Sequence, residues 1–249
     1  MTPAFAPAQV GLFGGTFNPI HVGHLRAAEE VAEALALERM VFVPSAKPPH
    51  KLPNPGDALA PASLRLAWVK TAIANNPRFA VDTLELEREG PSYSVDTLRT
   101  YAAKLEPARC VFVIGQDAFV ELGSWREPGA LLELAHFAVT TRPPRGQVSL
   151  ETWLPRALAD QVELAADGLS GRHRSAKTWI RTIEISSLEI SSSDIRARLR
   201  AGRSVRYLLP DEIHDAVVQS CVYGSGRGRS RGPGASDAPG APRKHKESR

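Results

Sequence analysis

Apolar positions along the chain fall into short continuous runs that alternate with stretches of helical spacing. The first run, residues 10–13, follows a lead-in rich in Ala and Pro and predicts a strand. Residues 22–35 then carry apolar side chains at helical spacing, and the compact run 40–43 predicts a second strand. Because the order is strand, helix, strand, we expect a right-handed crossover unit with two parallel strands.

The same alternation continues along the rest of the chain. Further strands are predicted at residues 79–86, 110–114, 136–140 and 182–188. Helices are predicted at residues 63–74, from about 94 to 105, at 131–134, from the serine cluster after residue 190 to about 200, and from residue 209. Ser63 is expected to cap the first of these helices, and Pro210 to take the first position of the last. Residues 146–177 show only a short helical pattern at 153–159, and we interpret them as a variable insertion.

The composition divides the chain into a folded part and a tail. Of the 249 residues 43% are apolar and 23% are charged, which is ordinary for a globular protein. This length is enough for one large or two small domains, and we expect one domain at residues 1–223. Residues 224–249 consist mainly of Gly, Ser, Pro and Arg, with hardly any apolar side chain. Such a segment cannot offset its ordering entropy, so we expect this tail to be disordered.

The basic charge of the chain belongs to this tail. Residues 224–249 hold seven Lys or Arg and two acidic residues, a net charge of +5, against +4 for the whole chain. The rest of the chain therefore carries −1. The tail could contact RNA or anionic surfaces weakly or keep the protein soluble; we favour the second, and expect no specific nucleic-acid partner.

Membrane and secreted classes are not indicated. No apolar run approaches the roughly 18–20 residues that span a bilayer, and residues 1–9 lack a basic region followed by an apolar one. The two cysteines, Cys110 in an apolar strand pattern and Cys221 near a helix end, do not suggest a disulfide framework. We expect a cytoplasmic protein.

The turn between the first strand and the first helix carries the clearest candidate chemistry. Gly14 and Gly15 allow a ligand to approach the backbone closely, and the following helix offers unpaired N–H groups and the positive end of its dipole. His21 and His24 are one turn apart, so both imidazoles could donate to one anion. Two alternatives stay open: an ordinary turn with incidental histidines, and a zinc site, which ranks low because no nearby Cys, Asp or Glu completes a ligand set.

This stretch, Gly-Gly-Thr-Phe-Asn-Pro-Ile-His-Val-Gly-His at 14–24, resembles the (T/H)-x-G-H signature of the nucleotidyltransferase superfamily. The form is that of the bacterial nicotinate-nucleotide adenylyltransferases. Four further stretches are similar to motifs of that family, in the same order: Pro-Pro-His-Lys at 48–51, Pro-Ser-Tyr-Ser at 91–94, Ile-Gly-Gln-Asp at 114–117 with Trp125 after it, and Ile-Ser-Ser-Ser-Asp-Ile-Arg at 190–196. The resemblance implies an α/β fold, a Rossmann-like doubly wound parallel sheet with flanking helices and a small C-terminal helical part.

The resemblance also implies which residues form the site. Catalytic roles fall to His21, His24 and Arg196. The residues implied to bind ATP are Gly14, Gly15, Thr16, Phe17, Asp117, Ser191, Ser192 and Ser193. From spacing alone, Asp117 and the serine cluster could equally cap the helices that follow them.

A second group is implied to hold the pyridine nucleotide. Its members are His50, Lys51, Tyr93, Ser94 and Trp125. The family usually has Thr where this chain has Ser94, and the hydroxyl is kept. From spacing alone, Ser92 or Ser94 could instead cap a helix, Trp125 could be core, and the basic loop could be merely solvated.

The implied activity is adenylyl transfer from ATP to nicotinate mononucleotide, giving nicotinate adenine dinucleotide and pyrophosphate in NAD biosynthesis. Magnesium would bridge the phosphates, because Mg²⁺ usually binds through substrate phosphates and water, so the chain itself needs no dedicated metal site. Three alternatives remain: a related transferase that uses phosphopantetheine or CTP, a preference for nicotinamide mononucleotide, and a non-catalytic nucleotide or RNA binder. The sequence also leaves open whether copies of the chain form a homo-oligomer.

Overall fold

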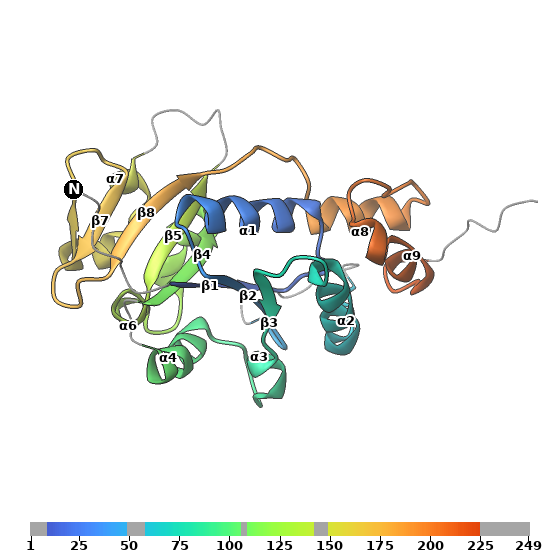
Figure 1. The fold of residues 1–249 in the computed structure, drawn as a ribbon, viewed down its shortest axis with the longest axis horizontal. Coiled ribbons are helices and arrows are strands. Elements are labelled where there is room, and N and C mark those ends of the chain that lie inside the picture. Colours follow the sequence, from blue (N-terminus) through green and yellow to red (C-terminus); the bar gives the residue numbers. More distant parts are fainter. Residues whose placement is uncertain (1–8, 49–57, 106–108, 142–148, 225–249) are drawn as a thin grey trace, which may run out of the picture.

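The computed structural model describes residues 9–48, 58–105, 109–141 and 149–224 (Figure 1). Within these ranges the strands form one eight-stranded sheet in the order β3-β2-β1-β4-β5-β8-β7-β6. The strands from β3 to β8 in this order pair in parallel, and β7 pairs antiparallel with β8 and β6. Their bounds are β1 Val10–Gly15, β2 Arg39–Pro44, β3 Phe79–Val81, β4 Cys110–Gly115, β5 His136–Thr141, β6 Val162–Leu164, β7 Ser170–His173 and β8 Trp179–Glu184. The predicted α/β fold with a parallel sheet is confirmed for the strands from β3 to β8 in this order, and the antiparallel strands β7 and β6 at one edge were not predicted.

The central strands are buried on both faces because helices cover each side of the sheet. In β2, Met40 and Phe42 enter one apolar core while Val41 and Val43 enter the other, as the period of two in a strand requires. Figure 1 shows α1 on one side of the strands and α4 on the other. The helices are α1 Val22–Ala34, α2 Ala62–Ile73, α3 Leu84–Glu87, α4 Ser94–Lys104, α5 Gln116–Val120, α6 Pro128–Leu134, α7 Leu150–Trp153, α8 Ser192–Arg200 and α9 Asp211–Gln219, with 3-10 turns η2 Leu122–Ser124 and η3 Arg156–Gln161. None of these helices is long and apolar enough to cross a bilayer.

The small C-terminal helical part is an extension of the core on the α1 face. Ile195 of α8 and Ile213 of α9 are fully buried, and they belong to the same apolar cluster as Trp68 of α2. Figure 1 shows α2, α8 and α9 together at one end of the molecule. The helical part predicted at this end is therefore present and packed against the sheet domain.

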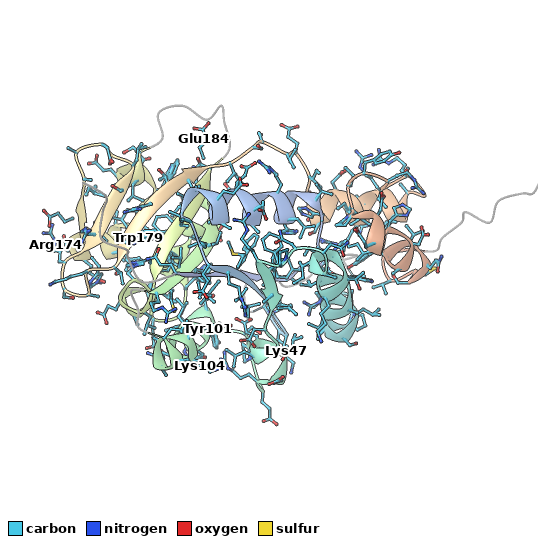
Figure 2. The ribbon with its side chains drawn as sticks, in the orientation of Figure 1. Lys47, Tyr101, Lys104, Arg174, Trp179 and Glu184 are labelled. Atoms are coloured by element: carbon cyan, nitrogen blue, oxygen red, sulfur yellow. The ribbon has the colours of Figure 1, made fainter. Side chains whose placement is uncertain are left out.

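The strand predicted at residues 79–86 is wrong in its second half. Strand β3 ends at Val81, because Asp82 turns the chain: its carboxylate accepts from the backbone N–H of Leu84 at 2.9 Å. Helix α3 follows. Tyr101 of α4, labelled in Figure 2, donates to the other oxygen of Asp82 at 2.5 Å and holds this turn against the sheet.

Residues 149–177 are an extension of the sheet. The helix predicted at 153–159 is divided between α7 and η3, and β6 and β7 then form a hairpin whose turn Asp167 stabilises by accepting from the N–H of Leu169 at 2.8 Å. The two strands have only three and four residues, too few for a period to appear in the sequence. Residues 142–148 lie outside the described ranges.

Other predicted boundaries shift by a few residues. Strand β8 starts at Trp179 and ends at Glu184, both labelled in Figure 2. The Trp179 ring stacks on His136 of β5 at a centroid distance of 4.4 Å. Pro61 is the N-cap of α2 instead of Ser63, and Pro210 is the N-cap of α9 instead of its first residue. These shifts are typical of helix ends.

We predict that Ile213→Ala lowers the free energy of unfolding by about 2–4 kcal/mol, because it opens a cavity in the core that α9 shares with α2. Urea titration measures the change. The exposed Gln219→Ala on the same helix is the matched control and should change stability by less than about 0.5 kcal/mol. Equal stability of the two variants would mean that α9 is not part of the domain core.

Candidate active site

The candidate site lies where the strand order reverses, at the carboxyl ends of β1 and β4. Strand β1 pairs with β2 on one side and with β4 on the other, so the loops after β1 and β4 diverge and leave a crevice, as in other open parallel sheets. Two cavities open there, one of about 730 Å³ and one of about 230 Å³. Gly14, Gly15 and Gly115 line both, together with Phe13, Thr16 and Pro48, so the two cavities share a floor that is rich in glycine.

Glycine is required for different reasons at the last two positions of β1, Gly14 and Gly15. A side chain on Gly15 would come within 2.8 Å of the Phe17 ring, so packing inside the protein excludes it. Phe17 is buried and itself takes a left-handed conformation, with φ 47°. Among the described residues, a Cβ at Gly14 would meet only Phe112, at an ordinary 3.6 Å. Packing therefore requires Gly15, whereas Gly14 leaves open backbone toward both cavities.

His21 and His24 form a stacked pair at the start of α1. Their ring centroids are 3.7 Å apart and their planes differ by 28°, so the two imidazoles share one face as predicted. The backbone N–H of His21, the N-cap, donates to Nδ1 of His24 at 3.3 Å, which leaves the proton of the neutral ring on Nε2. A Cβ at Gly23 would come within 3.1 Å of the His21 ring. Gly23 thus leaves room for the ring of His21.

The N-terminus of α8 forms the opposite wall of the larger cavity. Ser191 caps the helix by accepting from the N–H of Asp194 at 3.1 Å, so the capping interpretation is confirmed for this serine. Ser192 donates to the carbonyl of Pro19 at 2.9 Å and joins the helix to the loop after β1. Ser191, Ser192 and Ser193 all line the cavity.

Arg196 is buried on the same wall. Its Nη1 donates to the carbonyl of Asn18 at 3.0 Å and its Nη2 donates to Oγ of Ser193 at 3.3 Å. Asp117 also lines this cavity, and since Gly115 is the N-cap of α5, Asp117 does not cap that helix. The structure thus brings together around one cavity every residue predicted to be catalytic or to bind ATP.

Tyr93, Ser94 and Trp125, predicted to hold the pyridine nucleotide, line the smaller cavity. His50 and Lys51 lie outside the described residues, although Pro48, just before them, lines both cavities. Apolar strand residues such as Phe112 complete the walls. A flat aromatic ring suits such a pocket.

The capping role considered for Ser92 or Ser94 is wrong. Tyr93 is the N-cap of α4, and within the described part of the chain no side-chain hydrogen bond caps the helix. Ser92 accepts instead from the backbone N–H groups of Ala46 and Lys47, at 3.0 and 3.3 Å. The start of α4 is thereby joined to the loop after β2.

Two charged residues at the smaller cavity were missed by the sequence analysis. Glu85 is buried, its pKa is raised by burial, and it accepts from Oγ1 of Thr97 at 2.7 Å. Arg126 lies with its guanidinium carbon 4.7 Å from the centre of the Tyr93 ring. For Arg126 the position next to Trp125 was a usable signal. For Glu85 none existed, because the residue fell within a segment predicted to be a strand.

Arg65 of α2 is the third residue that was missed, and it has no exposed surface. Its guanidinium donates to three carbonyls: Ala60 at 3.0 Å, Thr16 at 2.6 Å and Ala46 at 3.3 Å. Within the described part of the chain it makes no ion pair with a carboxylate, and burial lowers its pKa. Arg65 therefore ties the loops after β1 and β2 to the segment before α2 through backbone dipoles alone.

Asn18 makes a second connection between these segments. Its Nδ2 donates to the carbonyl of Ala58, and its Oδ1 accepts from the N–H of Ala60, both at 3.0 Å. The hydroxyl of Tyr223, whose pKa burial raises, donates to the same Oδ1 at 2.5 Å. The end of the described chain is thus attached to the loop after β1.

No cluster of three or more His, Cys, Asp or Glu side chains that could hold a metal ion occurs within the described ranges. A metal ion at this site would need most of its ligands from elsewhere, such as phosphate oxygens and water.

Comparison with known proteins identifies the family. The profile of cytidylyltransferase-like proteins matches residues 12–198. The chain belongs to the cytidylyltransferase-like family. A protein of Geotalea daltonii named probable nicotinate-nucleotide adenylyltransferase is 41% identical over 219 residues, 88% of this chain and 100% of the relative. One of the same name from Trichlorobacter lovleyi is 42% identical over 215 residues, 86% of this chain and 99% of the relative. The predicted family resemblance is confirmed.

Solved structures support the fold. Plasmodium falciparum nicotinic acid mononucleotide adenylyltransferase complexed with NaAD aligns with a TM-score of 0.64, at 17% identity, covering 87% of this chain and 97% of that one. The same protein complexed with APC aligns with a TM-score of 0.61. The family's Rossmann-like arrangement is therefore that of this chain.

We predict that Arg65→Met lowers the free energy of unfolding by about 3 kcal/mol or more, because three buried carbonyls lose their donor. The exposed Lys70→Met on the same helix is the matched control, expected within about 0.5 kcal/mol of the unmodified protein. Chemical denaturation measures both. A neutral effect of Arg65→Met would show that the three segments hold together without this guanidinium.

Proposed function

We propose that this chain transfers the adenylyl group of ATP to nicotinate mononucleotide, giving nicotinate adenine dinucleotide and pyrophosphate in NAD biosynthesis. The observation that carries the proposal is the common glycine floor of two cavities. One cavity holds the stacked histidines, the α8 N-terminus and Arg196, and the other has aromatic walls. Relatives of about 40% identity carry the name nicotinate-nucleotide adenylyltransferase, which agrees with this arrangement.

The nucleophile in this reaction is the phosphate of the mononucleotide, which is already anionic at neutral pH, so no general base is required. The protein has to align this phosphate with the α-phosphorus of ATP and stabilise the charge that develops on the phosphoryl and leaving oxygens. His21 and His24 would donate to the α- and β-phosphates. The open backbone at Gly14 would let these phosphates approach closely.

The departing pyrophosphate would lie against the other wall. Ser192, Ser193 and Arg196 present hydroxyls, free N–H groups of the α8 N-terminus and a forked guanidinium. Asp117, at the start of α5, would accept from the ribose hydroxyls of ATP. Thr16 and Phe17, in the loop after β1, would complete the ATP-binding surface of the larger cavity.

Magnesium is the metal ion that we propose for the reaction. Mg²⁺ usually keeps several waters and binds through phosphates, so a cavity in which Asp117 is the one carboxylate among the described lining residues fits it. When bound it would neutralise charge on the phosphate chain. The histidines and Arg196 orient the same oxygens from the protein side.

The pyridine nucleotide would occupy the smaller cavity. Trp125 would stack on the ring, and the hydroxyls of Tyr93 and Ser94 would donate to polar groups of the nucleotide. His50 and Lys51, in the loop after Pro48, would meet its phosphate. We also propose a cytoplasmic location for the enzyme, with residues 1–223 as the transferase domain and residues 224–249 as a tail without a specific nucleic-acid partner.

A pyrophosphate-release assay tests the proposal. The full chain is incubated with ATP and Mg²⁺ together with nicotinate mononucleotide, nicotinamide mononucleotide or neither. We expect release that depends on a mononucleotide and is faster with nicotinate mononucleotide, as well as a dinucleotide product by chromatography. Release with phosphopantetheine or from CTP, or no release with either mononucleotide, would contradict the proposed function.

We predict that His24→Ala lowers kcat by at least about 100-fold, the scale of losing one oriented donor to the transition state. Two variants separate donation to the phosphates by His24 from its structural role, which is to accept a hydrogen bond from the backbone N–H of His21. His24→Asn can keep an acceptor near the Nδ1 position, and His24→Gln can place an amide near Nε2, so Gln should retain more activity than Asn. His214→Ala on α9, outside both cavities, is the control. A well-folded His24→Ala protein with normal turnover would refute the role.

A further inference from the structure

Arg126 stands at the rim of the smaller cavity in a defined geometry. It follows Trp125, and its guanidinium carbon lies 4.7 Å from the centre of the Tyr93 ring. This distance is within the range of a cation–π contact, so the aromatic ring serves as a platform for the guanidinium. About half of the Arg126 side chain is exposed, at 52%. A ligand in the cavity can therefore reach it.

Arg126 and Glu85 are the charged residues among those described that line this cavity. Glu85 is buried and accepts a hydrogen bond from Thr97, and burial raises its pKa, so its negative charge is disfavoured. Among the described residues, Arg126 therefore supplies the accessible charge of this cavity, which is positive and lies beside the rings of Tyr93 and Trp125.

Glu127, the acidic neighbour of Arg126, forms ion pairs with two arginines. Arg99 donates to both carboxylate oxygens of Glu127, with Nη1 at 3.2 Å from one of them. Arg126 pairs with the same carboxylate through Nε, at 3.6 Å from Oε1. Because this ion pair involves Nε, the Nη groups of Arg126 can still pair with a ligand.

Resting on the proposed function, we propose that Arg126 makes the enzyme select nicotinate over nicotinamide mononucleotide by pairing its guanidinium with the ring carboxylate. The two substrates differ only in this group, which is an anion in one and a neutral amide in the other. Hydroxyl and backbone donors, such as those at Ser94, can bind the oxygen of either group, whereas a cation at the rim favours the anion. Trp125 and Tyr93 bind the pyridine ring, and Arg126 distinguishes the carboxylate on that ring from an amide.

The test compares kcat/KM for the two mononucleotides in the full chain and in Arg126→Gln, Arg126→Lys and the control Arg172→Gln. Arg172 lies on β7, is exposed and lines neither cavity. We expect Arg126→Gln to lower kcat/KM for nicotinate mononucleotide by about 10-fold, the scale of one partly exposed charge-assisted hydrogen bond. The value for nicotinamide mononucleotide should change by less than about twofold.

Three further results would support the inference. The loss should appear in KM and not in kcat, because the carboxylate is remote from the reacting phosphorus. Arg126→Lys should keep part of the preference, since the charge remains while the fork is lost. Raising the salt concentration should weaken the preference of the unmodified enzyme and leave that of Arg126→Gln unchanged.

Two outcomes would overturn it. An equal loss with both mononucleotides would mean that Arg126 binds the phosphate or only orients Tyr93. An unchanged ratio would mean that other donors select the acid. Failure of the proposed function is distinguishable from both, because the unmodified chain would then release no pyrophosphate with either mononucleotide.

Discussion

The candidate site depends on one buried guanidinium. Arg65 has no exposed surface, and each of its three hydrogen bonds ends on a backbone carbonyl in a different segment: the loop after β1, the loop after β2 and the segment before α2. A cation taken out of water needs compensation, and here carbonyl dipoles supply it in place of a carboxylate. The segments that border both cavities are therefore held in one arrangement by a side chain that touches neither cavity.

The two cavities are adjacent because of the sheet topology. Loops after β1 and β4 leave the sheet on opposite sides, and the glycines at these strand ends leave backbone exposed between them. Two nucleotides bound on either side of such a floor would have their phosphates close together. Helix α8 then closes the larger cavity through Ser192 and Arg196, which bind the carbonyls of Pro19 and Asn18. The transfer chemistry that we propose needs this proximity more than any reactive side chain.

Much of the site could be read from the sequence because its elements are local. The spacing of His21 and His24 determines their common face, and Gly23 between them is explained by the ring that lies against it. Ser191 caps α8 three residues before its partner N–H, a distance that a motif records. Ser92 shows the limit of such reasoning: a serine before a helix suggests a cap, yet its partners are the N–H groups of Ala46 and Lys47, about 46 residues earlier.

By itself, the sequence determined the alternation of buried strands and helices, the glycine turn, the histidine pair and the capped α8, because each depends on neighbours within a few residues. Only the tertiary structure decided that Arg65 would join three loops, that Arg126 would lie over Tyr93, and that Glu85 would face the smaller cavity. It also turned a segment without a clear pattern into the β6–β7 hairpin. The physical reason is the same in each case: the partners are far apart in the chain, and packing of the whole domain, not local spacing, brings them into contact.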